Sequence, residues 1–284
     1  MKTIKILVIL LIIFFVSVIG ATIVVFATGY PNDFENYREV INYEESKNIG
    51  GITHIDIDMS TGKLKVIPTD DEEMLITFKG EKITLQNKKN FSIDVRVEDE
   101  TLKVIARTSH KGFQLFHWLR HAELVVHIPK TFDNNLTVTF STGDVVVRDL
   151  TLDQFTFNGS TGDVDLLNLS VNDAIVNFST GDIEATFKSG DVKMSLSTGE
   201  IDFVHLGQDF DIDISVKTGE LSIKLPVDAS FDIDAEVNVG SIAYDLPVSR
   251  TGTVGSKVVG HVGESGMNQV KLRVKTGEIE IERK

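Results

Sequence analysis

Apolar and polar residues alternate along most of the chain after residue 49. Around Gly219, for example, every second position is apolar: Ile212, Ile214 and Val216 precede the glycine, and Leu221, Ile223 and Leu225 follow it. A period of two places successive side chains on opposite faces of a β-strand, with one face buried and the other in water. The pattern therefore predicts an all-β domain.

Residues 49–130 keep this alternation without a strict repeat. The strand-like segments there are 54–59, 63–67, 91–95, 102–105 and 124–128. Because the terminal units of a repeat array are usually atypical, we interpret this part as the irregular beginning of the same sheet, which caps the array.

A Ser-Thr-Gly-Asp motif and its variants recur, from residue 141 onward at intervals of roughly 19 residues. Glycine adopts a positive φ without a Cβ clash, and Ser, Thr and Asp side chains suit solvated turns. We therefore predict structural turns at the glycine of each copy: Gly62, Gly143, Gly162, Gly181, Gly199, Gly219, Gly240 and Gly277. Antiparallel hairpins would fit these units, but the near-constant period and the repeated turn favour a β-solenoid-like stack of strand-turn-strand repeats.

The N-terminal segment contains no charged residue between positions 6 and 27, a run long enough to cross a bilayer as one helix. Lys2 and Lys5 precede it, which predicts a cytoplasmic N-terminus and an extracellular C-terminal domain. We predict a transmembrane signal-anchor over residues 1–28, a polar spacer over 29–48 and an extracytoplasmic domain over 49–284. A cleaved signal peptide is the alternative, but its apolar core is normally shorter.

The chain has a formal net charge of -14 and no cysteine. An acidic surface repels nucleic acid and anionic headgroups, so we expect no nucleic-acid partner. The lack of cysteine excludes disulfides and thiolate chemistry. The simplest explanation of the acidity is that it keeps an exported domain soluble.

Three motifs suggest chemistry, and each has a simpler explanation. Ser60 and Lys63 have the S-x-x-K spacing of penicillin-binding enzymes but occupy a repeat turn. His117 and His121 have zinc-ligand spacing, yet Trp118 stands where a zinc protease has glutamate, and no third ligand is apparent.

An acidic row is the third motif. Asp144, Asp163 and Asp182 would align if the coils stack in register, and such a row either binds calcium or forms solvated turn tips. The glycine-rich residues 249–267 lack the strand-to-helix context of a phosphate-binding loop. We therefore predict no catalytic residue, no cofactor, no metal site and no enzymatic activity.

Aromatic residues crowd one short segment. Phe113, Phe116 and Trp118 lie among histidine, lysine and arginine residues. Exposed aromatic clusters often mark interfaces, so these residues are a candidate contact patch for a membrane or partner. The alternative is that this segment folds back and seals one end of the stack, where an open sheet edge would invite aggregation.

Taken together, the apolar anchor, the Ile128-Pro129-Lys130 junction and the iterated Ser-Thr-Gly-Asp units resemble the putative-adhesin family of bacterial β-repeat domains of unknown function. The size and single anchor resemble its LiaG-like membrane-anchored members of the Gram-positive cell envelope. The resemblance covers residue 49 to the C-terminus and implies an extracytoplasmic domain without catalytic residues.

Two functional hypotheses follow. One is a non-catalytic, membrane-anchored envelope protein with an adhesin-like binding or scaffold domain for cell-wall polymer or a protein partner. The other is an accessory subunit of an envelope-stress sensing system that acts through membrane protein partners.

Overall fold

The computed structural model describes residues 38–83, 91–108, 118–248, 257–264 and 266–284. Within these ranges the chain is all-β, and its twelve strands form one continuous sheet. The strands are β1 (Arg38–Asn48), β2 (His54–Thr69), β3 (Glu73–Ile83), β4 (Phe91–Glu98), β5 (Thr101–Thr108), β6 (Trp118–Pro129), β7 (Asn135–Arg148), β8 (Thr151–His205), β9 (Ile212–Leu225), β10 (Phe231–Tyr244), β11 (Lys257–Val262) and β12 (Asn268–Arg283).

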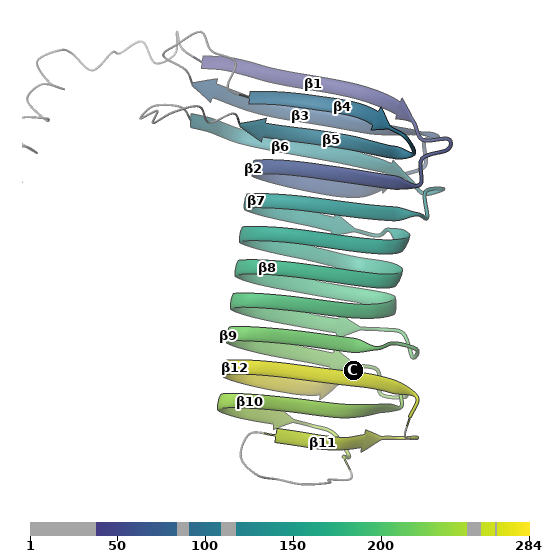
Figure 1. Cartoon of the computed structure of the whole chain (residues 1–284), viewed down its shortest axis with the longest axis vertical. Helices are drawn as coiled ribbons and strands as arrows, with labels where there is room; N and C mark the ends of the chain where they lie inside the picture. Colours follow the sequence, from purple (N-terminus) through teal and green to yellow (C-terminus); the bar gives the residue numbers. More distant parts are fainter. Residues whose placement is uncertain (1–37, 84–90, 109–117, 249–256, 265) are drawn as a thin grey trace, which may run out of the picture.

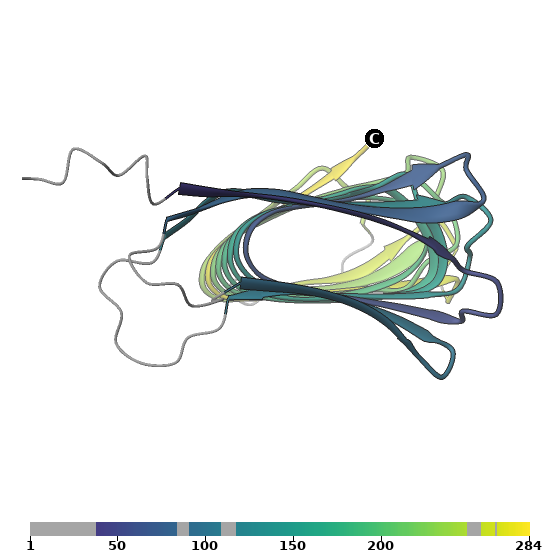
Figure 2. The same ribbon diagram turned by 90° about the horizontal axis from the view of Figure 1, so that it is seen from above.

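The coils of a flattened solenoid form the main body of the molecule (Figure 1). Each coil runs along one side, bends and returns along the other side, as the view along the stack shows (Figure 2). The bend follows the repeat glycines, which have positive φ angles. We call the residues before the glycine the leading limb and those after it the trailing limb. In β9 the buried residues are every second one on both limbs, so both limbs pack onto the same core.

Neighbouring coils pair in parallel with repeat aligned to repeat. Gly62 of β2 pairs with Gly143 of β7, and Gly199 of β8 with Gly219 of β9. The long strand β8 winds through several coils without a break. This pairing confirms the stacked solenoid and excludes the series of hairpins.

The order of the coils departs from the order of the sequence at the C-terminal end. β12 lies between β9 and β10 and pairs in parallel with both, and the short β11 pairs antiparallel with β10 (Figure 1). Gly277 therefore lies between Gly219 and Gly240. The last repeat in the sequence is an inner coil of the stack.

A buried asparagine stabilises this insertion. Asn268, at the start of β12, donates hydrogen bonds of 2.8 Å to the carbonyls of Gln208 and Ser230, and its Oδ1 accepts one of 3.1 Å from the Phe210 amide. Gln208 and Phe210 lie just before β9, and Ser230 lies just before β10. One side chain therefore connects β12 to both of its neighbours. Buried polar groups that are fully hydrogen-bonded favour one register over others.

The N-terminal strands cap the stack as two separate layers that both pair with β2. β5 and β4 continue the leading limb of β2, whereas β6, β3 and β1 continue its trailing limb (Figure 2). β1 includes residues that the sequence analysis assigns to the polar spacer. That boundary was wrong, because residues 38–48 pair along their whole length with β3.

The predicted anchor, residues 1–28, lies outside the described residues. Among the described residues there is no helix long and apolar enough to cross a membrane. The predicted strand segments within residues 49–130 are confirmed, since they lie in β2, β4, β5 and β6.

Candidate functional site

The repeat glycines form a column along the bend. Their φ angles lie between 126° and 141°, a region that side-chain-bearing residues rarely adopt. A Cβ on Gly181 would lie 1.8 Å from the carbonyl oxygen of Gly162, and the same conflict recurs from coil to coil. The column is therefore a structural element in which each backbone packs directly against the next.

The acidic row lies immediately after this column. Asp144 forms an ion pair with Lys63 at 3.2 Å, and Oδ1 of Asp182 accepts a hydrogen bond of 3.1 Å from the Glu200 amide. The described residues contain no group of three His, Asp or Glu side chains arranged to hold a metal. Lys63, the lysine of the S-x-x-K motif, is thus paired with a neighbouring coil.

The predicted aromatic patch falls mostly outside the described residues. Phe113 and Phe116 lie there, as does the side chain of Trp118, whose backbone begins β6 opposite Ile83. His117 is also outside them. His121 is exposed, with its Nδ1 3.8 Å from Oε2 of Glu81.

The outward side chains of the trailing limbs form an acidic surface, which we call the trailing face. Its acidic residues from β7 to β12 are Asp144, Asp163, Asp165, Asp182, Glu184, Glu200, Asp202, Glu220, Glu278, Glu280 and Glu282. Burial raises the pKa of the Asp165 carboxyl, and the charges of Asp163 and Asp144 add to this effect. Carboxylates on this face therefore repel one another.

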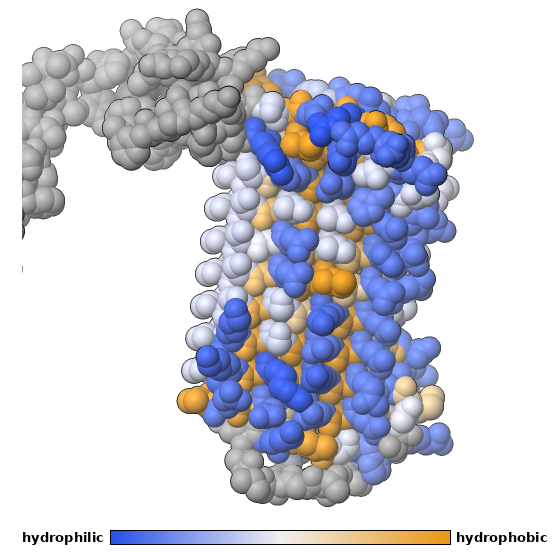
Figure 3. Space-filling view, viewed as in Figure 1, coloured by the Kyte–Doolittle hydropathy of each residue, from blue (hydrophilic) through white to orange (hydrophobic). Residues whose placement is uncertain are grey.

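The leading limbs present a different surface, which we call the leading face. In β7 and the first coils of β8 its outward residues near the bend are hydroxyl and amide side chains: Thr139, Ser141, Asn158, Ser160, Asn177, Ser179, Ser195 and Ser197. Figure 3 shows a pale column along the bend edge, the shade of weakly polar residues such as serine and threonine, with strongly hydrophilic residues joining it in the lower coils. Those lower coils contribute Lys217 and Lys275.

A shallow trough of about 400 Å³ lies among these hydroxyl and amide residues. Its floor is formed by the strand segments at Phe140, Gly159 and Phe178, and none of its lining residues is charged. We call it the bend trough. It crosses successive strands and so runs along the stack.

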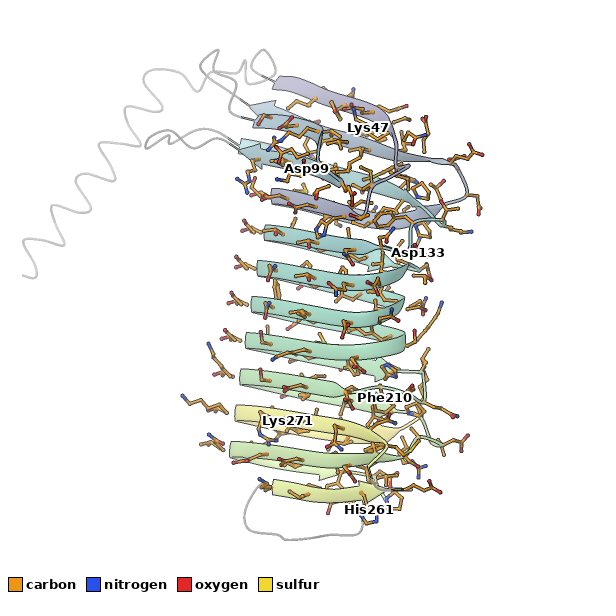
Figure 4. The ribbon with its side chains drawn as sticks, turned by 45° about the vertical axis from the view of Figure 1, so that its right-hand side comes forward. Lys47, Asp99, Asp133, Phe210, His261 and Lys271 are labelled. Atoms are coloured by element: carbon orange, nitrogen blue, oxygen red, sulfur yellow. The ribbon has the colours of Figure 1, made fainter. Side chains whose placement is uncertain are left out.

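A second trough of about 500 Å³ lies farther from the bend on the same face. Asp173, Asp191 and Asp211 line it together with Lys193 and Lys271. Figure 4 shows Lys271 on the leading limb of β12, and Phe210 at the opposite edge from the bend. The exposed Ile175 also lines this trough and lies two residues before Asn177 of the bend trough.

The leading face was missed by the sequence analysis. The signal was present, because aligning the repeats on their glycines places Ser141, Ser160, Ser179 and Ser197 at one position. The contrast between the limbs becomes visible only when the outward positions before and after each glycine are compared.

The architecture defines the chain as a β-solenoid protein with two chemically distinct faces. A family model described as Toastrack DUF4097 matches residues 52–282. Because this match covers well over half of the chain, the protein belongs to that family. The match confirms the resemblance to a β-repeat family of unknown function, and the narrower likeness to LiaG-like proteins stays a prediction.

Several solved structures are similar over most of the chain. One is described as a putative cell adhesion protein from Clostridium sporogenes, with 15% identity, 87% of this chain and 100% of that chain covered, and a TM-score of 0.40. Another is described as a putative adhesin from Bacteroides fragilis, with 14% identity, coverage of 87% and 97%, and a TM-score of 0.42. At these TM-scores the likeness carries no functional argument. No curated protein matches the chain.

Proposed function

We propose that this protein is a non-catalytic, membrane-anchored component of the bacterial cell envelope, whose solenoid is an extracytoplasmic binding or scaffold domain. The observation that carries the proposal is the pair of broad, repetitive faces on one continuous stack. Broad repeat surfaces are typical of solenoids that bind extended partners. The uncharged run over residues 6–27 is preceded by Lys2 and Lys5, and the first charged residues after it are Asp33 and Glu35, which supports the anchor and its orientation.

The direction of the stack supports this arrangement. The first described strand, β1, lies at one end of the stack, and β10 and β11 lie at the other end (Figure 1). An anchor preceding β1 would hold that end near the membrane. The two faces would then extend outward from the bilayer into the envelope, with the C-terminal coils farthest away.

The anchor is tested by N-terminal sequencing of the cell-associated protein and by protease treatment of intact cells. We expect the mature chain to keep residues 1–28 and its C-terminal domain to be digested from outside. A mature start near Thr28, or a domain protected in intact cells and digested only after lysis, would contradict the proposed topology.

The binding role is tested with purified full-length protein in detergent and isolated cell-envelope fragments. We expect the protein to cosediment with fragments from which membrane proteins have been extracted. Cosedimentation only with fragments that retain membrane proteins, together with crosslinks from residues near the anchor to such proteins, would favour the alternative role in envelope-stress sensing.

A further inference from the structure

We propose that the bend trough binds an extended, uncharged polysaccharide chain that lies along the stack. The proposal rests on the binding role above and assigns it to one face and one class of ligand. Its starting point is the contrast between this trough and the rest of the protein. The chain carries a net charge of -14, yet the only polar side chains that line the trough are neutral hydroxyl and amide groups.

The lining residues match the chemistry of a sugar chain. Serine, threonine and asparagine each donate and accept hydrogen bonds, as do sugar hydroxyls. Sugars also present apolar C–H faces. Ile175, a residue that is 45% exposed, supplies an apolar surface in the neighbouring trough, two residues before Asn177 on the same strand.

The asparagine column is ordered before any ligand binds. Asn177 donates its Nδ2 hydrogen bond to Oδ1 of Asn158 at 3.0 Å, and Ser195 donates its hydroxyl to Oδ1 of Asn177 at 2.9 Å. Each bond joins adjacent coils, so the side chains hold one another in place. A ligand would lose less conformational entropy in ordering these groups than in ordering mobile side chains.

The spacing of the trough suits a polymer. Successive coils are about 4.8 Å apart, the normal separation of paired strands, and each coil presents one serine and one Thr, Asn or Ser side chain to the trough. This spacing is close to the length of one sugar unit in an extended chain. A polymer lying along the stack would therefore meet equivalent groups at each unit.

Charge determines which kind of polymer fits. The trailing face is acidic and would repel an anionic polymer. The lysines of the leading face lie outside the bend trough, and Lys193 and Lys271 share their own trough with Asp191 and Asp211. An uncharged chain is the ligand that the bend trough accommodates without an unpaired charge.

The experiment measures retention of the full-length protein, in detergent, on insoluble chitin and on insoluble cellulose. We expect retention on at least one of these uncharged polymers, with equal strength in low and high salt, because hydrogen bonds between neutral groups are not screened. Retention that disappears in high salt would indicate recognition by charge and would overturn the proposal.

Two substitutions place carboxylates in the bend trough. Asn158→Asp keeps the Oδ1 that accepts from Asn177, and Ser160 is exposed, so Ser160→Asp adds a charge at the surface. We expect each variant to lose affinity by about tenfold, because a bound neutral ligand would remove water from the new carboxylate without pairing its charge. The matched control on the opposite face, Asp163→Asn, should bind as the unmodified protein does.

The outcomes separate this inference from the broader function. Equal retention of the trough variants and the control, with melting temperatures unchanged, would overturn the bend trough as the site. Binding to envelope fragments without retention on either polymer would overturn the neutral-polysaccharide ligand and leave the binding role intact. Absence of binding to both polymers and to envelope fragments would overturn both.

Discussion

The two faces of the solenoid are built on the same backbone and the same core, yet they differ in nearly every outward residue. The leading limb of β8 places Asn158, Ser160 and Ser179 outward, whereas the trailing limb places Asp163, Asp165 and Glu184 outward. Inward positions on both limbs are aliphatic or aromatic and buried. The fold therefore constrains the inward positions and the bend glycines.

This difference indicates where function can vary without cost to the fold. Surface substitutions usually change stability by less than about 0.5 kcal/mol, whereas core and backbone changes cost several kcal/mol. If the two faces differ only in their outward residues, damage to the shared core or bend should affect both faces at once. Changes to the outward residues of either face should leave the fold intact.

Removal of β12 should break both faces at the C-terminal end. A chain truncated after Met267 loses the buried Val270, Leu272, Val274, Ile279 and Ile281. At roughly 1.5–3 kcal/mol for each buried side chain, the loss is on the order of 10 kcal/mol, and β10 loses its pairing to the stack. Hydrogen exchange should show residues 231–244 unprotected. Protection of β10 in the truncated chain would mean that β10 can pair with β9 directly.

The position of β12 is also the feature of the fold that the sequence pattern predicts least well. The glycine period and the alternation predict the solenoid, the strands and the bend. They do not predict which repeats are neighbours, because equivalent units can stack in any order that the connections permit. A hint was present: Lys217-Thr218-Gly219-Glu220 and Lys275-Thr276-Gly277-Glu278 are identical, and the structure places them side by side.

Gly181→Val should damage the bend that the two faces share. A valine there needs a φ of 128° and a Cβ placed 1.8 Å from the Gly162 carbonyl oxygen. We expect a loss of roughly 3 kcal/mol or more in the free energy of unfolding. Asp182→Asn is the matched control, because it keeps the oxygen that accepts from Glu200, and it should cost less than about 0.5 kcal/mol. Urea unfolding compares them, and similar losses would contradict the structural role of the column.

His205 should make the stability of the protein depend on pH through a residue of the core and not of either face. The ring is fully buried, with Nδ1 3.2 Å from the Gly207 carbonyl and Nε2 3.2 Å from the Gly190 carbonyl. Burial lowers the pKa of His205 below its ordinary 6.5, although both carbonyls and Asp191 oppose this effect. The unfolded chain therefore binds a proton more readily, so stability is complete above about pH 6.5 and falls as the pH drops below it.

Thermal melts between neutral and mildly acidic pH test this dependence. His205→Phe removes the titrating group and should flatten the decline, even if the unpaired carbonyls lower stability at every pH. His121→Gln replaces an exposed histidine and should keep the decline. An unchanged slope in His205→Phe would assign the effect to other groups.

The chemistry of the faces was harder to predict than the fold. Alternation identifies the outward residues, and the bend glycine divides them between the two limbs, but which coils lie side by side to form a face is a long-range property. The same limit applies to β1, in which the half-buried Glu45 and Lys47 obscure the alternation. Pairing with β3 determines its structure, and pairing is a long-range property.

The smallest effect should come from the acidic face itself. Burial, with the charges of Asp163 and Asp144, raises the pKa of Asp165, so the folded protein disfavours the ionised form of this carboxyl. An acid whose pKa is raised on folding destabilises the protein at neutral pH, and this penalty shrinks as the pH falls toward the folded-state pKa. Asp165→Asn should therefore leave stability unchanged or raise it by up to about 0.5 kcal/mol at neutral pH. The difference in unfolding free energy between Asp165→Asn and the unmodified protein should shrink in acid. Urea unfolding at neutral and at acidic pH would measure it. A clear loss of stability at neutral pH would show that the acidic face is part of what holds the coils together, and the two faces would then differ in structure as well as in chemistry.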